Sequence, residues 1–353
     1  MARAGRRRFL QWGVAASGMW LVGGAIAPQQ GNALTLDGKW PLLDLSDFTI
    51  PLPDHWVTPV ADFYVQSALP QPDIEPVDVS SNRWRLSMSG LLDAPLSLSL
   101  SDIQRQPTEE VYWTLACIGN QAGGELLGNA CWQGTRLLPI LEQVGVMPEA
   151  RAFALRGADG YETGVLRQEL LHPDTMLVYA MNGELLPAQH GYPLRILIPG
   201  KYGQKQPKWL TEIEALAEPI AGHWERQGWS DRANILTHAL SRQVQQERVS
   251  IRNRRLTGER GDVAIAGMAL ASAQSIDRVE VSQDGGMTWK VAEHNHPPTP
   301  YEWTLWRHRW QLEPGDYTLM ARAVAGNETQ PLDDIIPLDG NQAVLAINLV
   351  IEP

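Results

Sequence analysis

Cysteine is scarce in this sequence: among 353 residues, only Cys117 and Cys131 carry a thiol. Neither stands in a CxxC motif and no group of His or Cys residues accompanies them, which argues against a zinc site. The sequence also lacks CxxCH, which excludes covalently bound c-type haem. Three interpretations of the thiols stay open: a disulfide closing a loop of about fifteen residues, a nucleophile with a nearby base, or one soft thiolate ligating a metal held by a cofactor.

Basic residues are also few relative to acidic ones, and the formal net charge is −11. Several arginines fall in a leader that has no acidic residue, so the rest of the chain is more acidic still. An acidic body argues against nucleic acid as a partner. Low-complexity sequence is scarce and no internal repeat occurs, which indicates ordinary globular folding. The length exceeds what one hydrophobic core usually organises and therefore favours two domains.

The leader has a basic cluster followed by a short apolar stretch rich in Gly and Ala, RRRFLQWGVAASGMWLVGGAIA. This pattern is typical of an export signal and is short for a stable membrane anchor. Its start, RRRFL at residues 6–10, resembles the twin-arginine consensus; a generic secretory signal and an uncleaved anchor are the alternatives. Cleavage after Ala27 or Ala33 fits the sequence, and we assign residues 1–33 to the signal. We therefore expect a periplasmic or otherwise exported protein, membrane-anchored if the signal is retained.

In the remaining chain, the pattern of apolar and polar residues changes near residue 220. Residues 34–220 mix strands with helical stretches, such as helical spacing in TRLLPILEQVGV (135–146) and a β-rich run in YPLRILIPG (192–200). Residues 221–353 contain alternating apolar and polar runs separated by turn residues, which predict a β-sandwich. The sequence therefore predicts an α+β protein, a mixed α/β domain followed by an all-β domain. We expect the basic segment 241–256 to be a solvated linker.

Four segments occur in an order that points to one family. CIGNQAGGELLGNACWQGTRL begins at Cys117, and VYAMNGELLPAQHGYPLRILIPGKYGQKQPKWLTEIEAL spans 178–216. HWERQGWSD follows at 223–231 and RVEVSQDGGMTW at 278–289. Together they resemble the signatures of the sulfite oxidase family of molybdopterin-dependent oxidoreductases. In this resemblance the first segment is the cofactor loop, and the third is the junction into a C-terminal immunoglobulin-like domain.

The resemblance implies a fold and a cofactor. The fold is a molybdopterin-binding domain of sulfite oxidase type followed by an immunoglobulin-like sandwich, and the cofactor is one Mo-molybdopterin per chain. Cys117 is implied to give molybdenum a thiolate, a strong donor to an electron-poor oxo-metal centre. Glycines near Cys117 permit close backbone approach to a bulky cofactor. Cys131 falls at the variable position of the loop motif, and we expect it to be buried and structural.

The same resemblance implies the residues that bind the cofactor. Its terminal phosphate needs cations and N–H donors, which arginine supplies as a fork and lysine as a point charge. Seen singly, such residues are more often surface charges or turn residues, but their shared spacing matches the family. The implied cofactor-binding residues are Tyr64, Val65, Gln66, Ser67, Asp159, His190, Arg195, Gln206, Pro207 and Lys208.

Three departures from the family pattern bear on the substrate. Gln66-Ser67-Ala68 stands where sulfite oxidases carry an arginine, and Gln121-Ala122 stands where they carry more arginines after the cysteine. The active-site tyrosine expected near the junction is either replaced by Trp229 or shifted in this sequence. A dianion entering a dry pocket without these cations would carry a large desolvation cost. A less charged oxygen acceptor, or an oxide to be reduced such as a sulfoxide or N-oxide, therefore fits better than sulfite.

The implied reaction is two-electron oxygen-atom transfer on a small-molecule substrate, with the cofactor carrying the chemistry and the protein orienting it. The sequence has no haem or iron–sulfur motif, so we expect electrons to pass to a separate c-type cytochrome or membrane redox protein. The C-terminal domain of this family often mediates dimerisation, which makes a homodimer an open expectation. The competing interpretation is an exported binding module in which Cys117 and Cys131 form a disulfide and no metal is bound.

Overall fold

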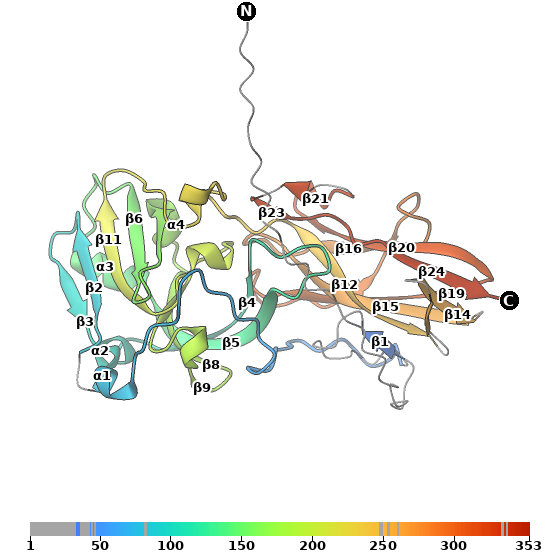
Figure 1. The fold of residues 1–353 in the computed structure, drawn as a ribbon, viewed down its shortest axis with the longest axis horizontal. Helices are drawn as coiled ribbons and strands as arrows, with labels where there is room; N and C mark the ends of the chain where they lie inside the picture. Colours follow the sequence, from blue (N-terminus) through green and yellow to red (C-terminus); the bar gives the residue numbers. More distant parts are fainter. Residues whose placement is uncertain are drawn as a thin grey trace, which may run out of the picture. The chain divides into compact units, whose positions relative to one another are not determined.

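The computed structural model describes residues 33–35, 43, 45, 47–80, 83–246, 250–252, 255–259, 261–332, 335–336 and 338–353. The predicted export signal, residues 1–33, lies outside these residues except for Ala33 and stays a prediction. Within the described part of the chain, no helix has the length and hydropathy needed to cross a membrane. Strands dominate the described residues, and the four short α-helices among them all belong to the N-terminal half of the chain (Figure 1).

Two five-stranded sheets form the N-terminal domain. In the first, β11 pairs in parallel with β2 and antiparallel with β6. Its order is β3 (Leu96–Leu98), β2 (Leu86–Gly90), β11 (Leu210–Leu216), β6 (Ala152–Gly157) and β7 (Glu162–Leu166). The second follows the order β10 (Arg195–Leu197), β8 (Met176–Met181), β5 (Leu127–Arg136) and β4 (Glu109–Ala116), with β9 (Glu184–Leu185) on β8.

One hydrophobic core joins these two sheets. Phe153 of β6 and Leu177 of β8 belong to the same buried cluster, although their strands lie in different sheets. Helix α3 (Leu138–Val144) covers this core with its apolar face, including Ile140. Each fully buried side chain of this size contributes roughly 1.5–3 kcal/mol to folding. The two sheets are therefore one domain with a shared interior, as the mixed texture of residues 34–220 predicts.

The helices are short, and local sequence explains where they begin and end. α2 (Leu100–Gln104) starts with a capping box, in which the Ser99 hydroxyl accepts the Asp102 N–H and the Asp102 carboxylate accepts the Ser99 N–H. α3 has a proline in its first turn and ends at Gly145, whose positive φ of 67° suits glycine. The remaining helices are α1 (Pro76–Ser80) and α4 (Arg167–Leu170), with 3₁₀ turns η1 (Ala188–His190), η2 (Gly203–Lys205) and η3 (Glu225–Gln227).

The C-terminal domain is the predicted β-sandwich. One sheet has the order β1 (Ala33–Thr35), β12 (His238–Gln246), β15 (Gly261–Leu270), β19 (Thr304–Leu312) and β18 (Glu293–His294). The other has the order β13 (Ser250–Arg252), β14 (Arg255–Glu259), β24 (Ile347–Glu352), β20 (Gly315–Ala325), β16 (Arg278–Ser282) and β17 (Lys290–Val291), with β21 (Glu328–Thr329) on β20. β22 (Ile335–Ile336) and β23 (Gly340–Asn341) form a separate pair.

Alternation along the strands produces the sandwich core. In β24, Ile347, Leu349 and Ile351 are buried while the residues between them are not. They pack with Val263 of β15 and Trp306 of β19 from the other sheet. A period of two residues thus places one face of each sheet inside, as the sequence predicts.

The expectation of a solvated linker over residues 241–256 is wrong. β12 covers the first part of this segment, and β13 and β14 follow it. Arg242 is only 3% exposed and donates hydrogen bonds to the carbonyl oxygens of Gly123, at 3.0 Å, and of Gly124. The segment's positive charge therefore does not imply a free surface: one of its arginines holds the loop that carries Cys117.

A further apolar cluster joins the two domains. It contains Ile118 and Tyr202 of the N-terminal domain and Leu240, Leu270 and Trp303 of the sandwich. Through these contacts the sandwich packs against Ile118, which directly follows Cys117 in its loop.

Candidate active site

A cavity of about 220 Å³ opens beside Cys117 in the N-terminal domain. Its wall combines segments that are far apart in the sequence, because strands of both sheets and the turns after them converge there. The predicted site residues on this wall are Tyr64, Gln66, Ser67, Cys117, Asp159, His190, Arg195, Gln206, Pro207 and Lys208. Val65 is not on the wall and is 47% exposed. The structure therefore brings together all the predicted residues except Val65.

Cys117 lies directly after β4, in a loop closed by its own hydrogen bonds. The Cys117 N–H donates to the Leu126 carbonyl at 2.8 Å, and the Asn120 N–H donates to the Cys117 carbonyl at 3.0 Å. The Asn120 side chain accepts the Leu126 N–H at 2.9 Å. Burial raises the pKa of the Cys117 thiol, and a hydrogen bond from the Gly119 N–H partly opposes this rise. The loop thus presents a single half-buried thiol to the cavity.

The two thiols are free and cannot meet in this fold. Cys117 pairs through its N–H with Leu126, the residue before β5. Cys131 is five residues after Leu126 and lies opposite Tyr112 in the β4–β5 pair. The rise of a strand separates these two positions by roughly 17 Å, far beyond the Cα separation of a disulfide. The Cys117–Cys131 disulfide of the competing interpretation is therefore excluded by strand register. The expectation that Cys131 is buried is also wrong, because its side chain is only half-buried.

Arg195 is a buried cation without a counter-charge in the described structure. It extends from β10, is 5% exposed, and lies 5.2 Å from the Trp132 ring. Its guanidinium donates to the carbonyls of His190 at 3.1 Å and Gln206 at 3.4 Å, while its Nε has no partner among the described residues. Burial lowers the pKa of Arg195 to about 10. An uncompensated buried charge is costly, so this position suits an anionic ligand.

Lys208 adds a second cation and connects the wall to the N-terminal tract. Its ammonium donates to the Ser67 hydroxyl at 2.7 Å and to the Gln189 carbonyl at 2.9 Å. Burial first, and Arg195 second, lower the pKa of Lys208 to about 8. The same two causes lower the pKa of His190 to about 4, so its imidazole is neutral at pH 7 and carries a single N–H, which bonds the backbone of Val60.

The other predicted residues have more structural roles. Both polar atoms of the Gln206 side chain bond the backbone. Its Oε1 accepts the Ile198 N–H at 3.1 Å, and its Nε2 donates to the Lys201 carbonyl at 2.6 Å. Asp159 follows β6, and its carboxylate accepts the Tyr161 N–H at 3.0 Å. Burial raises the pKa of Asp159, while that hydrogen bond opposes the rise. Asp159 keeps acceptor capacity for a donor in the cavity.

The wall nearest Cys117 is apolar and partly missed by sequence reasoning. Ile118, Gly119 and Leu126 line it in chain order, and Trp224 and Trp229 complete it. A Cβ atom on Gly119 would lie 3.6 Å from Trp229 Cη2 and 3.9 Å from Cys117 Sγ, so the indole and the thiol both lie close to this glycine. Trp224 meets Trp229 edge to face, with ring centroids 5.9 Å apart. Sequence reasoning noted Trp229 but not Trp224.

The donor set on this wall fits a molybdenum cofactor with an anionic tail. Cys117 provides one soft sulfur donor, and Arg195 provides a buried positive charge that lacks a carboxylate partner among the described residues. Gln204 Oε1, another buried atom of the wall, has no hydrogen-bond partner in the described structure and can accept from a ligand N–H. Lys208 adds a second cationic donor, and His190 lines the same wall.

Comparisons with known proteins agree with this geometry. Residues 72–224 match the family model of the oxidoreductase molybdopterin binding domain, and residues 236–343 match that of the Mo-co oxidoreductase dimerisation domain. The mitochondrial sulfite oxidase of Homo sapiens is 31% identical in an alignment 337 positions long, which covers 84% of this chain and 61% of that protein. The chain thus spans about three fifths of the length of such mammalian relatives.

Two further relatives extend the comparison. An uncharacterized oxidoreductase of Bacillus subtilis, YuiH, is 36% identical over 152 residues, which is 43% of this chain and 75% of that protein. The crystal structure of the sulfane dehydrogenase SoxCD from Paracoccus pantotrophus superposes with a TM-score of 0.69 and 20% identity over 84% of each chain, a likeness of fold. The two family models cover the molybdopterin-binding domain and the sandwich in that order. The chain belongs to the sulfite oxidase family of molybdopterin-dependent oxidoreductases.

Proposed function

We propose that this chain is an exported enzyme that transfers oxygen atoms at a molybdenum centre ligated by the Cys117 thiolate. The observation that supports this proposal most strongly is that one cavity wall carries both the Cys117 thiol and the buried, uncompensated Arg195. A soft donor and an anion site in one cavity match a metal joined to a phosphate-bearing organic ligand.

Each group on the wall has a role in this proposal. Cys117 binds the metal as a thiolate, and because burial raises the pKa of its thiol, metal binding must displace a proton. Arg195 and Lys208 would hold the terminal phosphate, His190 would line the same part of the wall, and Asp159 would accept from pterin N–H groups. The cofactor supplies the two-electron chemistry when bound, and these residues orient it and exclude water.

The proposed substrate is uncharged or weakly charged. The wall beside Cys117 consists of Ile118, Gly119, Leu126 and two tryptophans, and it carries no charge. A sulfite dianion entering this side would lose its hydration without gaining a cation from these residues. A sulfoxide or N-oxide instead places an apolar substituent against the indoles, so we rank these substrates above sulfite.

The partners in this proposal follow from what the chain would need. Electrons exchanged with the metal come from a separate c-type cytochrome or membrane redox protein. Residues 236–343 match a model named for dimerisation, which supports a homodimer built through the sandwich. The twin-arginine leader supports export to the periplasm after folding, because that route carries folded proteins.

Molybdenum quantification tests the proposal. Full-length protein, its Cys117→Ser variant and a matched Cys131→Ser control are purified after twin-arginine export. We expect about one molybdenum per chain in the wild type and in the Cys131→Ser control, and at least a tenfold loss of oxygen-transfer activity in Cys117→Ser alone. A screen of sulfite, sulfoxides and N-oxides then ranks the substrates. Wild-type protein without molybdenum, or Cys117→Ser with full activity, would overturn the proposal.

A further inference from the structure

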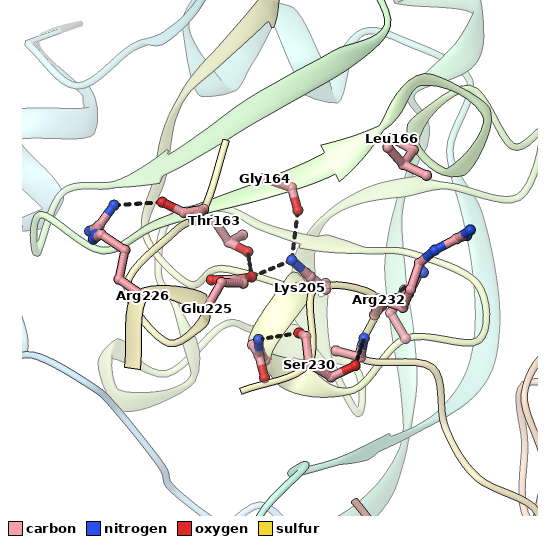
Figure 2. A network of polar contacts seen from close by, with 12 residues as sticks. Thr163, Gly164, Leu166, Lys205, Glu225, Arg226, Ser230 and Arg232 are labelled. Atoms are coloured by element: carbon pink, nitrogen blue, oxygen red, sulfur yellow. Dashed lines mark hydrogen bonds and ion pairs between the residues drawn. The ribbon is translucent and has the colours of Figure 1, made fainter. Parts of the chain in front are cut away.

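A buried ion pair lies behind the cavity wall and takes no part in the proposed chemistry. Lys205 ends η2 and Glu225 begins η3, and their side chains are 2% and 1% exposed. The Lys205 ammonium donates to one Glu225 carboxylate oxygen and to the Gly164 carbonyl, the latter at 2.7 Å. The Thr163 hydroxyl donates to the same carboxylate oxygen at 2.7 Å, and Figure 2 shows these groups converging between β7 and the two 3₁₀ turns.

The pair joins two segments that both line the cavity. On one side, Gly203 and Gln204 of η2 line the wall directly before Lys205. On the other side, Glu225 directly follows Trp224, whose carbonyl accepts the Trp229 N–H at 3.2 Å. Lys205 therefore anchors the short turn that presents both indoles.

A second contact fixes the far end of the same turn. The Gln204 amide donates to the carbonyl of Ser230, the residue after Trp229, at 3.0 Å. The backbone carbonyl of Gln204 in turn accepts a hydrogen bond from the Tyr161 hydroxyl at 2.7 Å. The turn from Trp224 to Trp229, here called the tryptophan turn, is thus held to η2 at both ends. The Lys205–Glu225 ion pair holds its first end, and the Gln204–Ser230 hydrogen bond holds its last.

Stability alone does not account for such a pair. Removing two charges from water costs about as much as their attraction returns, and apolar residues of similar volume are often as stable or more stable. What a buried pair does provide is a fixed register between the elements it joins, because any slip leaves both charges unpaired. Here the register fixed is that between η2 and the turn that carries Trp224 and Trp229, which line the same cavity as Cys117.

We propose that the Lys205–Glu225 ion pair is a positioning device that fixes Trp224 and Trp229 beside Cys117 and thereby selects substrates that carry an apolar, flat substituent. Lys205 and Glu225 act through the indoles and do not touch the substrate. The positional part stands on the contacts above. The selectivity part rests on the proposed function, because it requires an oxygen-transfer substrate at Cys117.

Fluorine NMR tests the positional part without any turnover. Full-length protein is made with 5-fluorotryptophan, and the resonances of Trp224 and Trp229 are assigned by single Trp→Phe substitutions. In Lys205→Met/Glu225→Gln, which removes both charges and keeps an acceptor for Thr163, we expect these two resonances to broaden or split. Trp306, in the core of the sandwich and 0% exposed, serves as the internal reference and stays unchanged.

A matched pair in the sandwich provides the control. Arg322 of β20 and Glu280 of β16 form an ion pair at 2.6 Å, and the Arg322 guanidinium lies 4.0 Å from the Trp289 ring. Arg322→Met/Glu280→Gln should shift the Trp289 resonance and leave Trp224 and Trp229 unchanged. If the Lys205 double variant does not fold, Gln204→Met replaces it, and then the Trp229 resonance should broaden. Sharp, unshifted Trp224 and Trp229 resonances in a folded variant would overturn the positional inference.

Relative turnover of two sulfoxides tests the selectivity part of the proposal. In Lys205→Met/Glu225→Gln, we expect kcat/KM for methyl phenyl sulfoxide to fall about tenfold relative to dimethyl sulfoxide, mainly through KM. Lys205→Arg, which keeps the charge, should restore at least half of the wild-type ratio on a logarithmic scale. An unchanged ratio in the double variant would overturn the selectivity part. If no sulfoxide or N-oxide is turned over but the fluorine resonances respond as expected, the proposed substrate class fails and the positioning role stands.

Discussion

Arg195 and Lys205 are two buried cations in neighbouring segments, and the fold treats them in opposite ways. Arg195 faces the cavity with only backbone carbonyls as hydrogen-bond partners among the described residues. Lys205 faces away from it and is neutralised by Glu225. A charge that is kept for a ligand is left uncompensated by the protein, whereas a charge that fixes the position of a segment is paired within it. This contrast separates ligand-binding residues from positioning residues more clearly than burial does.

The largest expected effect on folding comes from breaking the paired cation. Lys205→Met leaves the Glu225 carboxylate buried without its partner, which should lower the free energy of unfolding by about 3–5 kcal/mol. Urea denaturation of the cofactor-free protein measures this. Adding Glu225→Gln should recover most of the loss, and a single variant as stable as the wild type would contradict the buried pair.

The unpaired cation should respond with the opposite sign. Arg195→Met removes a buried charge that has no counter-charge in the described structure, so the cofactor-free protein should become more stable by about 1–2 kcal/mol. The same variant should lose most of its bound cofactor, measured as molybdenum and pterin per chain. Retention of cofactor, or a loss of stability in the cofactor-free form, would show that Arg195 has a structural role instead.

A smaller effect concerns the pH dependence of anion binding. Because burial and Arg195 lower the pKa of Lys208 to about 8 in the cofactor-free protein, its positive charge is lost as the pH rises through about 8. The affinity of cofactor-free protein for inorganic phosphate should therefore fall severalfold between pH 7 and pH 9, measured by calorimetry. Lys208→Gln should bind phosphate more weakly at pH 7 and lack this decline. An identical decline in both proteins would assign it to another group.

The smallest effect tests the apolar wall. In Gly119→Ala the new methyl group would lie at ordinary van der Waals distance from Trp229 and from Cys117. Folding should be unchanged, and, measured per bound molybdenum, kcat/KM for methyl phenyl sulfoxide should fall a few-fold more than that for dimethyl sulfoxide. Equal changes for both substrates would indicate that the gap beside Cys117 does not limit substrate size.

Sequence reasoning predicted the parts of the site that depend on local patterns. The resemblance of two segments to family signatures predicts Cys117, Arg195 and Lys208 as parts of one site, and the structure places all three on one cavity wall, while their binding roles stay predictions. The sandwich was predicted because alternation along strands such as Ile347–Glu352 is a local property. The sequence alone left open whether the two thiols form a disulfide. The register of β4 and β5 decides this, because it places Cys131 opposite Tyr112 and away from Cys117.

The missed residues act through contacts between distant segments. Lys205 pairs with Glu225 across 20 positions, and Arg242 reaches Gly124 across 118 positions. In sequence, Lys205 resembles an ordinary charge beside Lys208, and Arg242 resembles part of a solvated basic run. Only the folded chain shows that the first positions the tryptophan turn and that the second holds the cysteine loop.

The central claim is that the sulfur of Cys117 is bound directly to molybdenum. X-ray absorption at the molybdenum edge counts the sulfur neighbours of the metal in the wild type, in Cys131→Ser and in Cys117→Ser. We predict that Cys131→Ser matches the wild type and that any metal retained by Cys117→Ser has one sulfur neighbour fewer. An unchanged number of sulfur neighbours in Cys117→Ser would contradict the claim.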